Sequence, residues 1–286
     1  MGHDVTTDFS AWIGRTETFE DPLAVVQAQA AHATFDEAAP MIAAGDPLPL
    51  PWHWFYFLPR APQSMLDADG HPQRGGFLPP IPYPRRMFAG ARITVHRPLV
   101  VGTPALRQST IRNVVMKSGK TGALGFVTVG QHFSQGGELC LEEEQDIVYR
   151  EPGGRVEAPM AAELPQPPAG AWTRTVQPDT RLLFRFSALT FNAHRIHYDR
   201  SYASDVEGYP GLVVHGPLTA ALLLELVRRS TPRPVRAFSF RGVEPLFDLG
   251  PVRLIGTLQG DTVTLEAQGP DGALALAASA TLAPAC

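Results

Sequence analysis

The chain has 286 residues, which is long for a single hydrophobic core and enough for two domains of ordinary size. Hydrophobic residues make up 44% and charged residues 18%, a composition typical of a globular enzyme. The formal net charge of −4 gives no sign of a nucleic-acid partner. The two cysteines, Cys140 and Cys286, are too few and too far apart for a disulfide framework or a cysteine-rich zinc site. This cysteine usage favours a reducing compartment.

The sequence contains no segment that resembles a secretory signal or a membrane span. Residues 1–15 are polar and acidic and lack an apolar centre. The longest apolar stretch, residues 218–227, contains Glu225 and is too short to cross a bilayer. We therefore expect a soluble cytoplasmic protein without a membrane partner.

The first half predicts one helix, a long irregular loop and a strand meander. The helix is expected over residues 21–39, with Asp21 as N-cap and Pro22 at the first helical position. Residues 47–84 form the loop, and a loop of this length in a compact domain is usually functional. Its aromatic residues are expected either to pack in the core or to shape a pocket. Strands separated by hairpin turns are then expected at residues 92–102, 108–116, 123–133 and 139–149.

Residues 151–171 are rich in Pro, Gly and Ala and have few large apolar side chains, which is typical of a linker. This linker separates an N-terminal domain of residues 1–150 from a C-terminal domain of residues 172–286. The second half repeats the pattern, with a helix over residues 217–229 and a second meander. Its strands are expected at residues 240–250, 252–259, 261–268 and 273–282.

The helix over residues 217–229 is apolar on almost every side, and a helix of this kind is buried. One buried helix wrapped by an antiparallel meander, occurring twice, predicts an α+β double hotdog fold. The alternative is that the repeated pattern reflects no more than an antiparallel protein with several hairpins.

The most informative segment is residues 189–224. A polar cluster at residues 192–197 is followed by an apolar strand expected at residues 212–214, and His215-Gly216-Pro217 then opens the buried helix. A polar cluster beside a helix N-terminus suits a site where the helix faces a reacting group.

The run Asn-Ala-His-Arg-Ile-His at residues 192–197, followed by His215-Gly216, resembles the motif of the MaoC-type (R)-specific enoyl-CoA hydratases. That motif is Asp-x-Asn-Pro-x-His, followed by an apolar strand and His-Gly. Three positions depart from it: Asn192, His194 and Arg195 replace Asp, Asn and Pro.

The longer run FNAHRIHYD is similar to a narrower group, the mitochondrial-type 3-hydroxyacyl-thioester dehydratases together with mesaconyl-C4-CoA and itaconyl-CoA hydratases. In the first half, GHP at residues 70–72, GGFLPP at residues 75–80 and PRRM at residues 84–87 support the resemblance. The resemblance implies a double hotdog with its active site in the C-terminal half only, and a CoA thioester as substrate.

Addition of water to a 2-enoyl thioester needs a base, a proton for the α-carbon and stabilisation of the thioester oxygen. His197 is the expected base, because imidazole titrates near neutral pH. Asn192 cannot take a proton, but its amide can hold the water. The backbone N–H of Gly216 is expected to stabilise the oxyanion at the helix N-terminus.

Four further residues are expected to contact the substrate: Arg195, His194, His215 and Arg86. Arg195 is expected either to pair with a substrate carboxylate or to hold a CoA phosphate or pack on a loop. His215 is expected to act mainly as a structural partner. Arg86 is a candidate for holding an anion, and its alternative is an ordinary surface cation.

No metal and no cofactor is expected. His194, His197 and Asp199 are loosely spaced for a metal site, and water addition to a thioester does not require one. Asp199 is expected to cap a short helix that follows it or, alternatively, to orient His197.

These features predict a hydro-lyase that adds water to a C5 unsaturated dicarboxyl-CoA, such as itaconyl-CoA or mesaconyl-C4-CoA, to give citramalyl-CoA. The alternatives are a 3-hydroxyacyl-thioester dehydratase of fatty chains, a hotdog thioesterase and a non-catalytic acyl-CoA-binding protein. A homo-oligomer, in particular a dimer, is expected.

Overall fold

The computed structural model describes residues 8–119 and 122–285. Of the two cysteines, Cys140 is a buried free thiol, and Cys286 lies outside the described residues.

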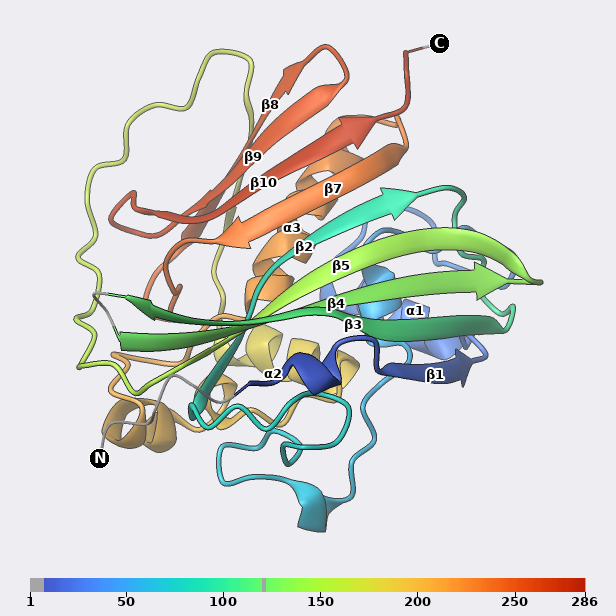
Figure 1. Ribbon diagram of the computed structural model, residues 1–286. Helices are drawn as coiled ribbons and strands as arrows, with labels where there is room; N and C mark the ends of the chain where they lie inside the picture. The colour runs from blue at the N-terminus through green and yellow to red at the C-terminus, as the bar shows by residue number, and fades with distance from the viewer. Residues whose placement is uncertain (1–7, 120–121, 286) are drawn as a thin grey trace.

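The described chain forms a ten-stranded antiparallel sheet in the order β1-β3-β4-β5-β2-β7-β10-β9-β8-β6 (Figure 1). The strands are β1 (Thr16–Asp21), β2 (Arg85–Val95), β3 (Ala105–Gly119), β4 (Gly122–Gln135), β5 (Glu138–Arg150), β6 (Trp172–Val176), β7 (Val235–Gly242), β8 (Val252–Gln259), β9 (Thr262–Gln268) and β10 (Leu274–Leu282). The first five strands along the chain form one half of the sheet, and the last five form the other.

The two halves meet where β2 pairs with β7, in the middle of the sheet (Figure 1). At this junction Gly90 lies opposite Arg241, and a Cβ atom on Gly90 would lie 2.5 Å from the carbonyl oxygen of Phe240. The two strands can approach this closely because Gly90 has no side chain. Residues 151–171, between β5 and β6, contain no helix or strand. The division into two domains at this segment stays a prediction.

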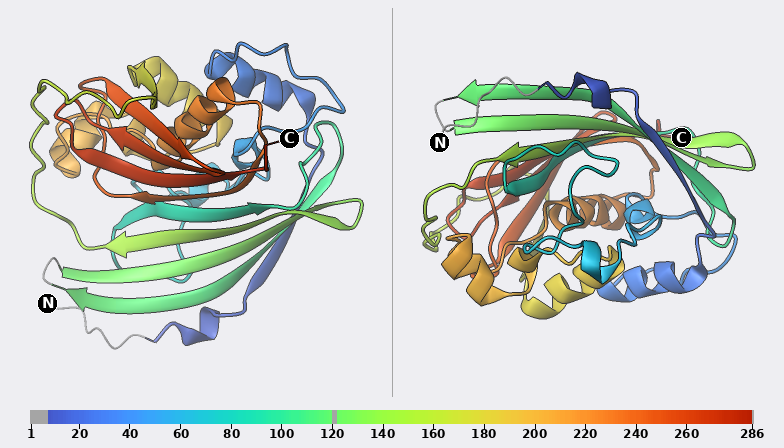
Figure 2. Two further views of the ribbon diagram at one scale, coloured as in Figure 1. Left: turned by 90° about the horizontal axis from the view of Figure 1, so that it is seen from above. Right: turned by 60° about the horizontal axis from the view of Figure 1, so that its bottom comes forward.

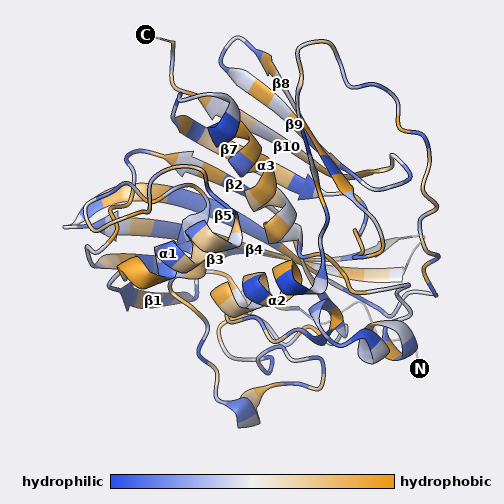
Figure 3. Ribbon diagram, turned by 180° about the vertical axis from the view of Figure 1, so that it is seen from behind, coloured by the Kyte–Doolittle hydropathy of each residue, from blue (hydrophilic) through white to orange (hydrophobic). Residues whose placement is uncertain are grey.

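Three α-helices lie on the same side of the sheet (Figure 2): α1 (Val25–Thr34), α2 (Thr180–Leu189) and α3 (Gly216–Ser230). Every residue of α3 from Leu218 to Val227 is buried, as its apolar sequence predicts. Polar residues gather at its C-terminal end (Figure 3). The one carboxylate in the buried part, Glu225, is paired with Arg174 and Arg229, which offsets the desolvation of its charge.

The expected N-terminal helix is shorter than predicted, and its proposed cap was wrong. Asp21 ends β1, and its buried carboxylate accepts hydrogen bonds from the backbone N–H groups of Leu23 (2.9 Å) and Phe57 (3.0 Å). Leu23 has a φ of 45°, so the chain turns before α1 begins at Val25. Only Ala28 and Ala31 of α1 are buried, and the helix packs beside α2 instead of lying inside the first meander.

Six meander strands appear close to their predicted positions, but the first strand of each meander was predicted too far along the chain. The strands expected at residues 92–102 and 240–250 are β2 and β7, which end before Pro98 and Pro245 because proline cannot donate to a strand ladder. Three further helices or strands were not expected: β1, β6 and α2. β1 and β6 are short edge strands with many exposed residues, so they lack a strong apolar alternation. The strand expected at residues 212–214 is reduced to a single bridge between Val213 and Phe247.

Candidate active site

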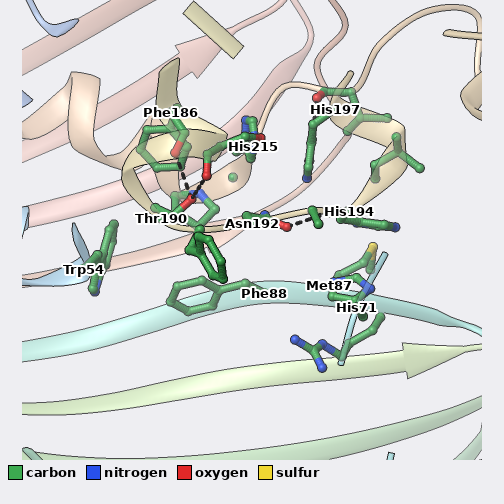
Figure 4. Close-up of a pocket in the computed structure, with 18 of the residues that line it drawn as sticks. Trp54, His71, Met87, Phe88, Phe186, Thr190, Asn192, His194, His197 and His215 are labelled. Carbon is green, nitrogen blue, oxygen red and sulfur yellow. Dashed lines mark hydrogen bonds between the residues drawn. The ribbon is translucent and has the colours of Figure 1, made fainter. Parts of the chain in front are cut away.

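A cavity of about 1010 Å³ lies between the start of α3, the motif segment, strand β2 and the loop that precedes β2. It is lined by residues of both halves of the chain, and four histidines meet in it (Figure 4): His71, His194, His197 and His215. The active site expected in the C-terminal half therefore has walls from the N-terminal half as well.

His197 ends a 3-10 turn, Arg195–His197, and is 7% exposed. Its Nδ1 lies 2.7 Å from the carbonyl oxygen of Val213. A carbonyl can only accept, so Nδ1 carries the proton and Nε2 keeps a free lone pair at the cavity. Burial lowers the pKa of His197 to about 4, and the Val213 carbonyl opposes this shift. The ring is therefore neutral near pH 7, as a general base must be.

His215 is the N-cap residue of α3, and its ring stacks on that of His197. Its Nε2 lies 2.9 Å from the hydroxyl oxygen of Ser187. Its Nδ1 is buried and has no hydrogen-bond partner within the described ranges. Burial, followed by the neighbouring His197, lowers the pKa of His215 well below its usual range. The ring of His215 thus packs against that of His197. Its Nδ1 is a polar atom without a hydrogen-bond partner in the described ranges.

Gly216 is the first residue of α3 and lines the cavity. Its backbone N–H has no hydrogen-bond acceptor in the part of the chain that the structure describes. The first N–H groups of a helix carry the positive end of its dipole. Gly216 therefore offers a donor where an oxyanion would bind.

Asn192 and His194 form a tight turn at the start of the motif. The side-chain oxygen of Asn192 accepts the backbone N–H of His194 at 2.9 Å, as the dashed line in Figure 4 shows. The amide NH₂ of Asn192 is left for other partners in the cavity. The ring of His194 lies 5.3 Å from that of His197 and 4.0 Å from that of His71. Burial, then His71 and His197, lower the pKa of His194 to about 2.

Arg195 does not line the cavity and packs on the neighbouring loop, in agreement with the second of its two expected roles and not with pairing to a substrate carboxylate. Its guanidinium donates to the carboxylate of Asp199 (2.8 Å) and to the carbonyl oxygen of Ala68 (3.1 Å), and it lies over the ring of Tyr202. The carboxylate four residues on draws the side chain outward. Asp199 also accepts the backbone N–H of Tyr202 at 3.0 Å, in agreement with its expected role as a cap.

Arg86, in contrast, lies on β2 and lines the cavity. It has no acidic partner within ion-pair distance among residues 8–119 and 122–285. Its neighbour Arg85 is paired with Glu207 at 2.8 Å. Of the adjacent arginines, Arg86 is the one whose charge is available to a ligand.

The sequence analysis missed one pair of residues, Asp69 and His71. Nδ1 of His71 lies 3.0 Å from a carboxylate oxygen of Asp69, and His71 lines the cavity. Asp69, His71 and His194 offer ligand atoms that all lie within 4.8 Å of one another, so among the described residues these three are close enough together to hold a metal ion. The sequence feature that could have indicated this pair is an Asp two residues before a His within a long loop.

The cavity also has aromatic lining residues, among them Trp54 and Phe88. The ring of Phe88 lies 5.7 Å from that of Trp54 and 5.6 Å from that of Phe240. The neighbouring Trp52 and Phe55 are buried in the core instead. The aromatic residues of the long loop therefore do both things that the sequence suggested, because some pack in the core and Trp54 shapes the pocket.

This fold is a double hotdog. A solved MaoC-like dehydratase aligns with 97% of this chain and 100% of its own, with a TM-score of 0.74 and 15% identity. A conserved hypothetical protein of Mycobacterium tuberculosis, described as a double hotdog, aligns with 95% of this chain and 96% of its own, with a TM-score of 0.57 and 13% identity. These likenesses confirm the predicted fold.

The sequence profile of the family described as "Hydroxyacyl-thioester dehydratase type 2" matches residues 51–248. The chain belongs to this family, which confirms the predicted family and class of enzyme. The Mesaconyl-C(4)-CoA hydratase of Chloroflexus aurantiacus is 64% identical over 277 residues, which cover 97% of this chain and 99% of the relative. In the described part of the chain, no helix has both the length and the apolar character that a membrane crossing requires.

Proposed function

We propose that this protein is an acyl-CoA hydratase that adds water to mesaconyl-C4-CoA and forms citramalyl-CoA. The observation that carries the proposal is the 64% identity, over nearly the full length of both chains, to a mesaconyl-C(4)-CoA hydratase. In this substrate the β-carbon of the enoyl thioester bears a methyl group and a carboxylate. The site must therefore provide a base, an oxyanion donor and a cation close together.

The described site contains candidates for the first two of these. Nε2 of His197 takes a proton from water as the water oxygen bonds to the β-carbon. The electron pair of the double bond moves toward the thioester oxygen, where the N–H of Gly216 and the dipole of α3 stabilise the charge. The amide NH₂ of Asn192 holds the water. The rings of His215 and His194 pack against that of His197, and burial keeps His197 neutral.

Arg86 is the proposed partner of the substrate carboxylate. It lines the same cavity as His197 and has no acidic partner in the described ranges. A guanidinium binds a carboxylate through two parallel hydrogen bonds, and the pair is strengthened where water is excluded. The contacts of Arg195 with Asp199 and Ala68 support the choice of Arg86 over Arg195 for this role.

The aromatic lining residues Trp54 and Phe88 favour a second candidate, a dehydratase of 3-hydroxyacyl thioesters with plain apolar chains. Itaconyl-CoA is a further candidate substrate because it also carries a carboxylate.

Chromatographic detection of the hydrated CoA thioester separates these candidates when mesaconyl-C4-CoA, itaconyl-CoA and crotonyl-CoA are compared. The proposal expects the highest kcat/KM with mesaconyl-C4-CoA, by at least about tenfold, the discrimination that about 1.4 kcal/mol provides. A preference for crotonyl-CoA would support the fatty-chain dehydratase, and binding without turnover would support a non-catalytic acyl-CoA-binding protein. The expected homodimer stays a prediction for light scattering, and the cytoplasmic location stays a prediction for cell fractionation.

A further inference from the structure

We propose that Asp69 and His71, which come from the loop of the first half, form the second acid–base group of the active site. The inference rests on the proposed function. Hydration needs one group that takes a proton from water and one that delivers a proton to the α-carbon. Asn192 cannot deliver a proton. Of His71, His194, His197 and His215, His71 is the one whose ring is hydrogen-bonded to a carboxylate in the described ranges, so it is the best candidate for the second group.

The conformation of the loop brings the carboxylate of Asp69 against the ring of His71, so that the two side chains form a dyad. The backbone N–H of Asp67 donates to the carbonyl oxygen of His71 at 2.7 Å, which closes a tight turn. One carboxylate oxygen of Asp69 accepts the backbone N–H of His71 (2.9 Å), and the other accepts from Nδ1 of its ring (3.0 Å). Nε2 of His71 then has no hydrogen-bond partner in the described ranges, and the ring lies on the cavity (Figure 4). A carboxylate on Nδ1 stabilises the imidazolium that proton transfer at Nε2 requires.

Two contacts dock this loop on the catalytic motif. The backbone N–H of Arg195 donates to the carbonyl oxygen of Asp69 at 2.8 Å. The guanidinium of Arg195 donates to the carbonyl oxygen of Ala68. At Gly70 the two segments touch, because a Cβ atom there would lie 1.8 Å from the carbonyl oxygen of Ala193. This contact explains why Arg195 turns away from the cavity, since it holds the loop that carries the dyad.

The proposed cycle begins with neutral His197 and protonated His71. His197 takes a proton from water while the water oxygen bonds to the β-carbon, and the electrons of the double bond form the enolate. The enolate then takes the Nε2 proton of His71 at the α-carbon, and the thioester carbonyl re-forms. The proton on His197 returns to His71 through water in the cavity. The net change is one water added across the double bond.

Five charged or titratable groups act on His71: Asp69 and Arg74 from its own loop, Arg86 from β2, and His194 and His197 from the motif. Burial, then Arg86, lower the pKa of His71, while Asp69 opposes the shift. A substrate carboxylate that pairs with Arg86 removes this repulsion. A carboxylated substrate therefore favours the protonated form of His71.

The test compares purified wild type with His71→Gln, Asp69→Asn and the matched control His96→Gln, which removes a 42% exposed imidazole outside the cavity. Each protein is assayed across pH with whichever of mesaconyl-C4-CoA, itaconyl-CoA and crotonyl-CoA the wild type hydrates best. We expect His71→Gln to lower kcat at least about 100-fold with KM changed less than about threefold, the scale for a lost acid–base group. The alkaline limb of the kcat profile disappears in His71→Gln and moves to lower pH in Asp69→Asn.

Several outcomes overturn the inference. If His71→Gln keeps the wild-type pH profile, or loses activity only in step with a lower melting temperature, His71 is structural. If a chelator inactivates the wild type and Zn²⁺ restores it, Asp69, His71 and His194 form a metal site. If the wild type hydrates another of the three substrates better than mesaconyl-C4-CoA, the proposed substrate is wrong. The dyad is then tested by the activity of the variants with that better substrate. A wild type that hydrates none of the three overturns both.

Discussion

The imidazole rings of His197 and His215 are stacked, with centroids 3.6 Å apart and planes inclined by 19°. Two protonated rings at this distance would repel each other, and both are buried. The pair is therefore neutral in the folded protein. This arrangement suits His197 as a base and links the stability of the fold to pH.

Stability should fall as pH drops from about 6.5 toward 4. The pKa values of His194, His197 and His215 are all lowered in the fold, whereas the unfolded chain takes up protons below about 6.5. The stabilisation from these neutral histidines is therefore complete above their pKa in the unfolded chain. It is lost as the pH falls toward their pKa in the folded protein. For His197, whose folded pKa is about 4, it amounts to about 3 kcal/mol. Melting temperatures at pH 7.5 and 5.0 measure the effect, and a smaller fall in His197→Gln identifies its share. An unchanged melting temperature between these pH values would contradict it.

His197→Gln should lower kcat at least about 100-fold while the folded structure is retained, because the variant has no base at the water. Activity is measured by chromatographic detection of the hydrated CoA thioester, and folding by circular dichroism. Near-normal turnover by a folded variant would remove His197 from the mechanism.

Arg86→Gln should impair carboxylated substrates selectively. Loss of one guanidinium–carboxylate pair in a dry pocket is worth about 2–4 kcal/mol, which corresponds to a fall of about 30- to 1000-fold in kcat/KM with mesaconyl-C4-CoA. Crotonyl-CoA should change less than about threefold, because it has no carboxylate to pair. Arg92→Gln is the matched control on the same strand, since Arg92 pairs with Glu144 and Asp146 outside the cavity. Equal losses with both substrates would place Arg86 on the CoA portion.

Arg195→Gln should impair both kinds of substrate about equally, by about tenfold or more, because it loosens the loop that carries His71. The measurement is kcat/KM with mesaconyl-C4-CoA and with crotonyl-CoA. A loss confined to the carboxylated substrate would return Arg195 to the role that the sequence first suggested.

Gly70→Ala should displace the same loop. Gly70 has a φ of 93°, and an added Cβ would lie 1.8 Å from a backbone oxygen of Ala193. We expect kcat to fall about tenfold or more, the scale of misplacing a catalytic group. Gly75→Ala is the control for backbone strain, because Gly75 has a φ of 91° but open space around it, with its nearest contact at 3.8 Å. If the two variants behave alike, the contact with Ala193 has no special role.

The sequence determined the parts of this protein that depend on local order along the chain. The strand meanders, the linker segment and the buried helix α3 follow from alternation, turn residues and an unbroken apolar run, and each of these is a property of neighbouring residues. The same is true of the turn at Asn192 and of the start of α3 at Gly216. The edge strands and α1 were less predictable, because exposed and half-exposed elements carry a weak apolar pattern.

Only the tertiary structure decided which residues face one another in the site. His71 lies over 120 positions before His194 in the chain, yet their rings are 4.0 Å apart because the loop docks on the motif. Arg195 is adjacent to His194 in sequence but turns outward to Asp199, and Arg86 of the other half lines the cavity in its place. The spacing of residues in the sequence determines which side chains lie near one another within a single segment. Pairing of β2 with β7 and the packing of the loop fix which segments share a cavity, and these contacts act between residues that are distant in the chain.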